Sequence, residues 1–242
     1  MKKRESGEKR GKSTKRSYTL ALEGATYQGS VALLVDSTVI AERTLRVADD
    51  AIPSVGRGER LMPAVAECLH EAGAKRGEIA RIVCGAGPGS FTSLRVAGSV
   101  AKGLAAGYGV DLFAVSSLLL TVSGPDSRLV PGEYLSVLDA MRGEFFAVRV
   151  FLKSGGSATQ KEPVRILSAE QLHDFAAQEP ATKVIGPGQQ IDGRPHARGV
   201  APILDSLIEA GPVDLASWEP DYGRLAEAQV RWEAAHGRPL IR

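Results

Sequence analysis

A glycine-rich stretch in the middle of the chain has residue types that can hold a phosphate group. It reads CGAGPGS over residues 84–90 and is followed by a long run of small and apolar residues. A P-loop requires GxxxxGK[ST], and no Lys-Ser or Lys-Thr pair stands at the required place. A dinucleotide-binding loop requires GxGxxG, and Ser90 stands where the third glycine belongs. The stretch therefore matches neither of these phosphate-binding patterns.

What remains is a short strand, a tight turn and the start of a helix. Gly87 and Gly89 allow a sharp turn, and Pro88 stiffens it. Ser90 or Thr92 is placed to cap the helix that follows. Such a helix terminus can hold an anion through its free N–H groups. The alternative is a plain strand-to-helix turn, which is what most glycine clusters form.

The sequence offers little for metal or nucleophilic catalysis. Ser90 and Ser93 have no evident base and orienting group, which a serine nucleophile requires. Two histidines one helical turn apart, the common zinc-binding arrangement, do not occur. The four histidines are instead far apart in the sequence, at His70, His173, His196 and His236. We therefore expect no catalytic residue, no metal site and no cofactor.

Composition indicates an ordinary globular chain. It has 242 residues, of which 43% are hydrophobic and 24% charged, as in soluble domains. No apolar stretch approaches the length of a membrane span, and the N-terminus does not resemble a signal peptide. Cys68 and Cys84 lack CxxC spacing, so we expect buried, reduced thiols. Together these features predict a cytoplasmic protein that does not contact a membrane.

The net charge of +2 hides an uneven distribution. Residues 1–17 hold eight Lys/Arg and two Glu; subtracting these from the totals of 30 and 28 leaves 22 basic against 26 acidic residues. Residues 1–17 have almost no apolar side chains to bury, so we predict a disordered basic tail. Such a tail can contact RNA phosphates nonspecifically. The acidic remainder argues against a freestanding RNA-binding module.

Strands and helices alternate along both halves of the chain. In the first half, periodicity predicts strands over Tyr18–Glu23, Ser30–Asp36, Thr38–Arg46, Arg81–Cys84 and Leu112–Val115, and helices over Gly58–Ala72 and Thr92–Ala106. In the second half it predicts strands over Tyr134–Leu138, Phe145–Phe151, Val164–Leu167 and Lys183–Ile185, a helix opened by the capping box Ser168–Gln171, and a last helix over Asp221–His236. We therefore predict two α/β subdomains, residues 18–115 and 116–242.

The glycine-rich stretch also resembles a family hallmark. GPGSFTSLR at residues 87–95, with AKGLA at 101–105, is similar to the GPGSFTGLR…AKGLA motif of bacterial TsaB (YeaZ) proteins, with Ser93 in place of the usual glycine. The matching residues include Gly87, Pro88, Gly89, Ser90, Phe91, Thr92 and Arg95. Further similarities follow in the same order as in the family: Glu59–Pro63 to its first-helix segment, Leu138–Glu144 to LDARRGE, and Pro220–Arg224 to P-x-Y-x-R.

The resemblance implies a fold and a role. The fold is that of the actin and Hsp70 ATPases (the ASKHA fold), with two related α/β subdomains. The role is that of a non-catalytic partner subunit in forming N6-threonylcarbamoyladenosine at position 37 of tRNA. The implied partners are a TsaD-like transferase subunit, a TsaE-like ATPase subunit and a possible second copy of the chain, with tRNA bound through the complex. The family usually has an Asp-Thr pair at the end of the first strand; Glu23-Gly24 stands here, and whether this turn binds a ligand stays open.

Two further interpretations concern surfaces and rival functions. Small residues let a helix approach a neighbour closely, so we expect the first two helices to form the pairing face, with contacts at Leu61, Val65, Ala97, Gly98, Ala101 and Lys102. Periodicity alone does not distinguish such a face from packing within one fold. The rival function is a stand-alone ATP-binding enzyme of the same fold. Such an enzyme keeps aspartates in its phosphate loops, whereas here Glu23 is the acidic residue after the first strand.

Overall fold

The structure is a computed structural model, and it describes residues 17–45, 57–124, 129–179, 182–224 and 235–237. The tail predicted over residues 1–17, except Ser17, lies outside the described residues. So does most of the last predicted helix. Its first residues, Asp221–Arg224, are described and are not helical.

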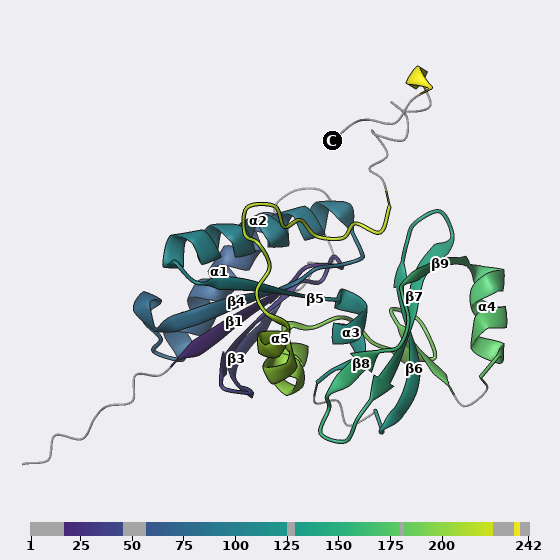
Figure 1. Cartoon of the computed structure of the whole chain (residues 1–242), viewed down its shortest axis with the longest axis horizontal. Coiled ribbons are helices and arrows are strands. Elements are labelled where there is room, and N and C mark those ends of the chain that lie inside the picture. Colours follow the sequence, from purple (N-terminus) through teal and green to yellow (C-terminus); the bar gives the residue numbers. More distant parts are fainter. Residues whose placement is uncertain (1–16, 46–56, 125–128, 180–181, 225–234, 238–242) are drawn as a thin grey trace, which may run out of the picture.

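The first half of the chain forms a five-stranded sheet with the strand order β3-β2-β1-β4-β5 (Figure 1). Strand β1 pairs antiparallel with β2 and parallel with β4; β2 pairs antiparallel with β3, and β4 parallel with β5. The strands are β1 (Tyr18–Glu23), β2 (Ser30–Val35), β3 (Thr38–Thr44), β4 (Ile79–Gly85) and β5 (Asp111–Val115). Helices α1 (Arg57–Glu71) and α2 (Phe91–Tyr108) cover one face, and the 3-10 turn η1 (Arg76–Glu78) precedes β4.

The second half forms a six-stranded sheet with the order β11-β10-β6-β7-β8, in which β9 also pairs with β7. Its elements are β6 (Gly132–Asp139), β7 (Glu144–Leu152), β8 (Ala158–Gln160), β9 (Arg165–Ser168), α4 (Ala169–Ala177), β10 (Lys183–Gly186) and β11 (Ile191–Asp192). Strand β6 pairs antiparallel with β7 and parallel with β10, as β1 does with β2 and β4. The central strands of the two sheets therefore share one topology, which indicates two related halves.

Helix α3 (Ser117–Val122), which periodicity did not predict, connects the two sheets. Leu120 packs into the core of the first sheet, whereas Leu118 and Val122 pack into that of the second. Helix α4 covers the other face of the second sheet and begins with the predicted capping box. The Gln171 N–H donates to Ser168 Oγ at 3.2 Å, and the Ser168 N–H donates to Gln171 Oε1 at 2.9 Å.

The last described segment returns to the first sheet. The 3-10 helix η2 (Ala197–Ile203) and α5 (Leu204–Ala210) pack on the face opposite α1 and α2. Residues 211–224, here called the C-terminal strap, then cross the edge of the sheet and run along α2 (Figure 1). All strands of the second sheet lie after residue 116, but the segment from residue 197 to 224 packs mainly with the first half. The predicted boundary near residue 115 therefore separates the sheets, not two contiguous packing units.

Candidate interaction site

The glycine loop (residues 85–90) is attached to the rest of the chain through its own backbone N–H groups. The Gly87 N–H donates to Ser117 Oγ at 3.1 Å, and the Ser90 N–H donates to the Ala25 carbonyl oxygen at 2.7 Å. A phosphate cradle presents such groups to its ligand. Here the Gly87 and Ser90 N–H groups are satisfied within the chain, so these two groups are not available to a phosphate ligand.

Close backbone approach explains the glycines of this loop. Gly87 has a φ of +91°, and a Cβ at this position would collide with the backbone oxygen of Asp221 in the strap. A Cβ on Gly89 would likewise collide with the Ala25 carbonyl oxygen. The Asp221 N–H also donates to the Ala86 carbonyl oxygen at 2.7 Å. The glycines therefore make room for the strap and for the turn after β1.

The start of α2 differs from the predicted cap. Ser90 occupies the N-cap position, but its hydroxyl lies 3.1 Å from Ser93 Oγ and accepts no backbone N–H. Thr92 lies inside the first turn and is exposed. Neither side chain caps the helix, because Ser90 is held by its own backbone N–H bond to the turn after β1 and turns its hydroxyl toward Ser93.

Two motif residues form a small surface with the strap. Phe91 is 39% exposed, and its ring lies 4.6 Å from that of Tyr222, measured between centroids. The Arg95 guanidinium lies 5.4 Å from the centre of the Phe91 ring, a cation–π contact. At the end of the strap, Arg224 forms an ion pair with Glu144 of β7. The strap thus connects the start of α2 to the second sheet.

The interface predicted from small residues is wrong in its choice of helix face. Ala97 and Ala101 are 1% and 0% exposed, and Leu61 and Val65 of α1 are also buried. All four belong to the core between the helices and the first sheet. Leu94 and Leu104 lie on the same side of α2 at helical spacing, and their burial directs that face inward. The sequence could have predicted this burial, because residues 94, 97, 101 and 104 form one apolar stripe along the helix.

The two other predicted interface residues contact the strap. Gly98 is buried, and a Cβ on it would lie 2.8 Å from Pro220 Cγ. The Lys102 ammonium group donates to the carbonyl oxygens of Trp218 and Ala216 at 2.9 and 3.3 Å. The close helix contact that the small residues permit is therefore made within the chain, by its own C-terminal segment.

The outer face of α1 and α2 carries a second set of small and apolar residues, here called the outer face. Met62 is 44% exposed, and a Cβ on Gly103 would meet nothing within 4 Å. The exposed members on the two helices are Met62, Pro63, Ala66, Ser99, Gly103 and Ala106. Short side chains on adjacent exposed helices leave room for helices of a partner to approach.

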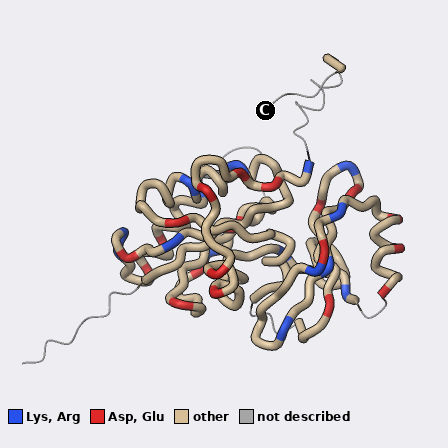
Figure 2. The backbone as a smooth tube through the Cα atoms, in the orientation of Figure 1, with Lys and Arg blue, Asp and Glu red and all other residues tan. Residues whose placement is uncertain are grey.

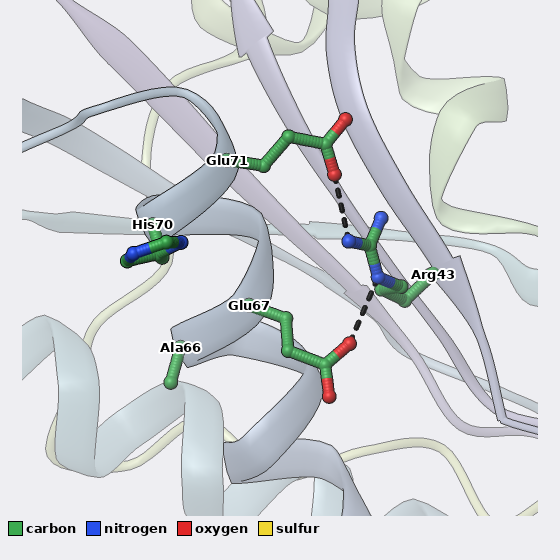
Figure 3. A pocket seen from close by; sticks show the side chains of 5 residues that line it. All are labelled: Arg43, Ala66, Glu67, His70 and Glu71. Carbon is green, nitrogen blue, oxygen red and sulfur yellow. Dashed lines mark hydrogen bonds and ion pairs between the residues drawn. The ribbon is translucent and has the colours of Figure 1, made fainter.

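Two glutamates one turn apart on α1 form ion pairs with an arginine of the sheet. Figure 3 shows Arg43 of β3 between Glu67 and Glu71, with N–O distances of 2.9 and 2.7 Å. Ala66 and His70, which line the same shallow hollow, lie on the other side of the helix in this view. The two ion pairs therefore connect α1 to the edge strand β3 at the surface, while Ala66 stays on the outer face.

Glu23, the last residue of the first strand, is buried at the junction of the two halves. It is 1% exposed, and its carboxyl group accepts from the Ala25 N–H at 2.6 Å and from the Ser117 hydroxyl at 3.0 Å. Burial raises the pKa of Glu23 to about 7, against the opposing effect of these hydrogen bonds. Periodicity places Glu23 at the end of a strand, but its buried contacts depend on α3, which was not predicted.

The remaining polar groups of the described ranges are dispersed. They contain no group of three His, Cys, Asp or Glu side chains that could hold a metal ion. Figure 2 shows acidic and basic residues interspersed along both halves. His196 is mostly buried beside Thr44, and burial lowers its pKa to about 4. No described helix is both long and apolar enough to span a membrane.

A family model described as TsaD, tRNA N6-adenosine threonylcarbamoyltransferase, matches residues 56–182, about half of the chain. Two curated relatives are named tRNA threonylcarbamoyladenosine biosynthesis protein TsaB. The protein from Escherichia coli is 30% identical and the match covers 90% of this chain and 98% of that protein. The protein from Bacillus subtilis is 29% identical over 88% of this chain and 96% of its own length.

Solved structures of YeaZ and of a YeaZ-like protein are similar to this chain as well. YeaZ from Pseudomonas aeruginosa has a TM-score of 0.69 at 26% identity, covering 85% of this chain and 99% of its own. A second structure, described as similar to the peptidase YEAZ from the same organism, has a TM-score of 0.72 at 26% identity, covering 86% of this chain and 100% of its own. These likenesses confirm the predicted actin/Hsp70-like α/β fold. The chain belongs to the family that the threonylcarbamoyltransferase model describes, and within it to the TsaB (YeaZ) proteins.

Proposed function

We propose that this chain is the non-catalytic partner subunit of the complex that forms N6-threonylcarbamoyladenosine at position 37 of tRNA. The relatives named for this biosynthesis match it over nearly its whole length. The observation that carries the non-catalytic role is the glycine loop, whose Gly87 and Ser90 N–H groups bond within the chain. A phosphate-binding loop keeps such groups for its ligand.

The partner is a TsaD-like transferase subunit, and the outer face of α1 and α2 is the surface that pairs with it. This surface replaces the buried residues expected from the sequence. Two exposed helices with short side chains fit a partner that presents a similar helix pair, as a related subunit of this fold does. A second copy of the chain fits the same surface, so a homodimer competes with the pair. A TsaE-like subunit joins the pair, and tRNA binds through the whole complex, in the cytoplasm.

The rival function, a stand-alone ATP-binding enzyme, finds little support in this geometry. Glu23, the acidic residue at the end of β1, is buried and accepts hydrogen bonds from Ala25 and Ser117. It is therefore not available to hold a metal–nucleotide complex without rearrangement of the junction.

The deciding experiment is co-expression of the chain with the TsaD-like subunit of its own organism, followed by size-exclusion chromatography. We expect a stable heteromeric peak, and threonylcarbamoylation of tRNA only when both subunits are present. The chain alone should show no ATPase, peptidase or transferase turnover. Turnover by the isolated chain, abolished by a point mutation within it, would overturn the proposal.

A further inference from the structure

The carboxyl group of Glu23 lies where four segments of the chain meet. It accepts the Ala25 N–H of the turn after β1 and the hydroxyl of Ser117, the first residue of α3. A Cβ on Gly85, at the end of β4, would collide with the carboxylate. The glycine loop follows directly. Glu23 thus lies against the turn after β1, the end of β4 and the start of α3.

Ser117 relays this contact to the glycine loop. Its Oγ accepts the Gly87 N–H at 3.1 Å, so its own hydroxyl hydrogen is available to donate to Glu23. Its backbone N–H donates to the Gly87 carbonyl oxygen at 2.8 Å. Gly87 is therefore held by two hydrogen bonds to one serine, whose hydroxyl is oriented by Glu23.

The surroundings of Glu23 disfavour its ionised form. The segments packed against it contribute glycine, alanine and serine, and among the described residues the thiol of Cys84 in β4 interacts with it electrostatically. Burial raises the pKa of this thiol as well, so it stays neutral and supplies no positive charge. Among the described groups, donors from Ala25, Gly24 and Ser117 alone stabilise the carboxylate, and burial outweighs them.

We infer that Glu23 is a proton-dependent positioning residue for the glycine loop. The protonated carboxyl group stays in the buried junction and keeps Ser117 and Gly87 connected. Ionisation favours a locally open state in which water hydrates the carboxylate and the loop separates from α3. Because this loop begins α2, opening also loosens the outer face relative to the second sheet; this last consequence rests on the proposed pairing, whereas the opening itself does not.

Native-state hydrogen exchange on the isolated full-length chain tests the inference. The readouts are the Gly87 and Ser117 amides, corrected for the intrinsic pH dependence of exchange. With a carboxyl pKa of about 7 in the closed state and 4.5 in the open state, the opening constant should rise by up to about tenfold per pH unit between these values and level off above them. The Gly193 amide, which donates to Gly186 in the second sheet, is the reference.

Glu23→Gln is the matched variant, because an amide fills the same space without titrating. Its Gly87 and Ser117 opening constants should be flat over this pH range. Equal slopes in the wild type and in Glu23→Gln, or a flat wild type, would overturn the inference. If the variant does not fold, the wild-type comparison decides. An opening free energy at Gly87 equal to that at Gly193 at every pH means that the loop opens only when the whole chain unfolds, which contradicts the inference. A lower, pH-dependent opening free energy confined to Gly87 and Ser117 supports it.

Discussion

Ala97 of α2 lies against Gly24 in the turn after β1, so closely that a Cβ on Gly24 would be 2.6 Å from the Ala97 Cβ. Helix α2 can approach the sheet to this distance because both residues are small. The small residues of α2 that suggest a surface for a partner are thus buried in contacts within the chain.

Replacing Ala97 with Arg should therefore unfold the chain and not merely abolish pairing. An arginine side chain does not fit a packed site with 1% exposure, and burying its guanidinium there costs several kcal/mol. Thermal denaturation followed by circular dichroism checks this. Ser99→Arg, on the exposed side of the same helix, is the control and should leave the melting temperature nearly unchanged. A well-folded Ala97→Arg chain would show that the core assignment is wrong.

Substitutions on the outer face should have the opposite effect. Ala66→Arg and Ala106→Arg replace exposed helical alanines, so the chain should stay folded while the bulky charge weakens pairing with the TsaD-like subunit by at least about tenfold. Calorimetric titration measures the affinity. Ala177→Arg, an exposed alanine on α4, is the matched control. Unchanged affinity in both outer-face variants would place the pairing surface elsewhere.

The contact between the strap and α2 predicts a contrast between two glycines of one helix. Gly98→Leu should destabilise the chain by about 1–3 kcal/mol, because the new side chain meets Pro220 and Trp218. Gly103→Leu meets nothing within 4 Å and should be neutral or slightly stabilising, since leucine has the higher helix propensity. Urea denaturation gives both values. Similar effects at the two positions would mean that the strap does not pack on Gly98.

Global stability should depend on pH through Glu23. Its pKa is about 7 in the folded chain against 4.5 as the ordinary value, so the folded state binds more protons between these pH values. The contribution of Glu23 is complete below pH 4.5 and is lost as the pH rises to 7, by up to about 1.4 kcal/mol per unit. Urea denaturation of the wild type and Glu23→Gln from pH 5 to 8 isolates this term. If the difference in unfolding free energy between the wild type and Glu23→Gln did not change with pH, the raised pKa of Glu23 would be contradicted.

The sequence determined most of the local structure. Alternating and continuous apolar runs predicted β1 at its observed bounds and most other strands and helices to within a few residues, because hydrophobic periodicity is a local property. Ser168 and Gln171 predicted the start of α4, because a capping box involves residues three apart in the sequence. The motif beginning at Gly87 carried the family resemblance, which the comparisons confirm.

Only the tertiary structure decided which surfaces are free. Small residues lie on all sides of α2. The sheet, α1 and the strap determine that Ala97, Gly98 and Ala101 are buried while Gly103 faces solvent. The strap comes from more than a hundred residues further along the chain, so no local pattern could place it there. Glu23 likewise meets Ser117 across 94 positions. Burial and pairing of this kind depend on contacts between segments distant in sequence, which the folded chain alone brings together.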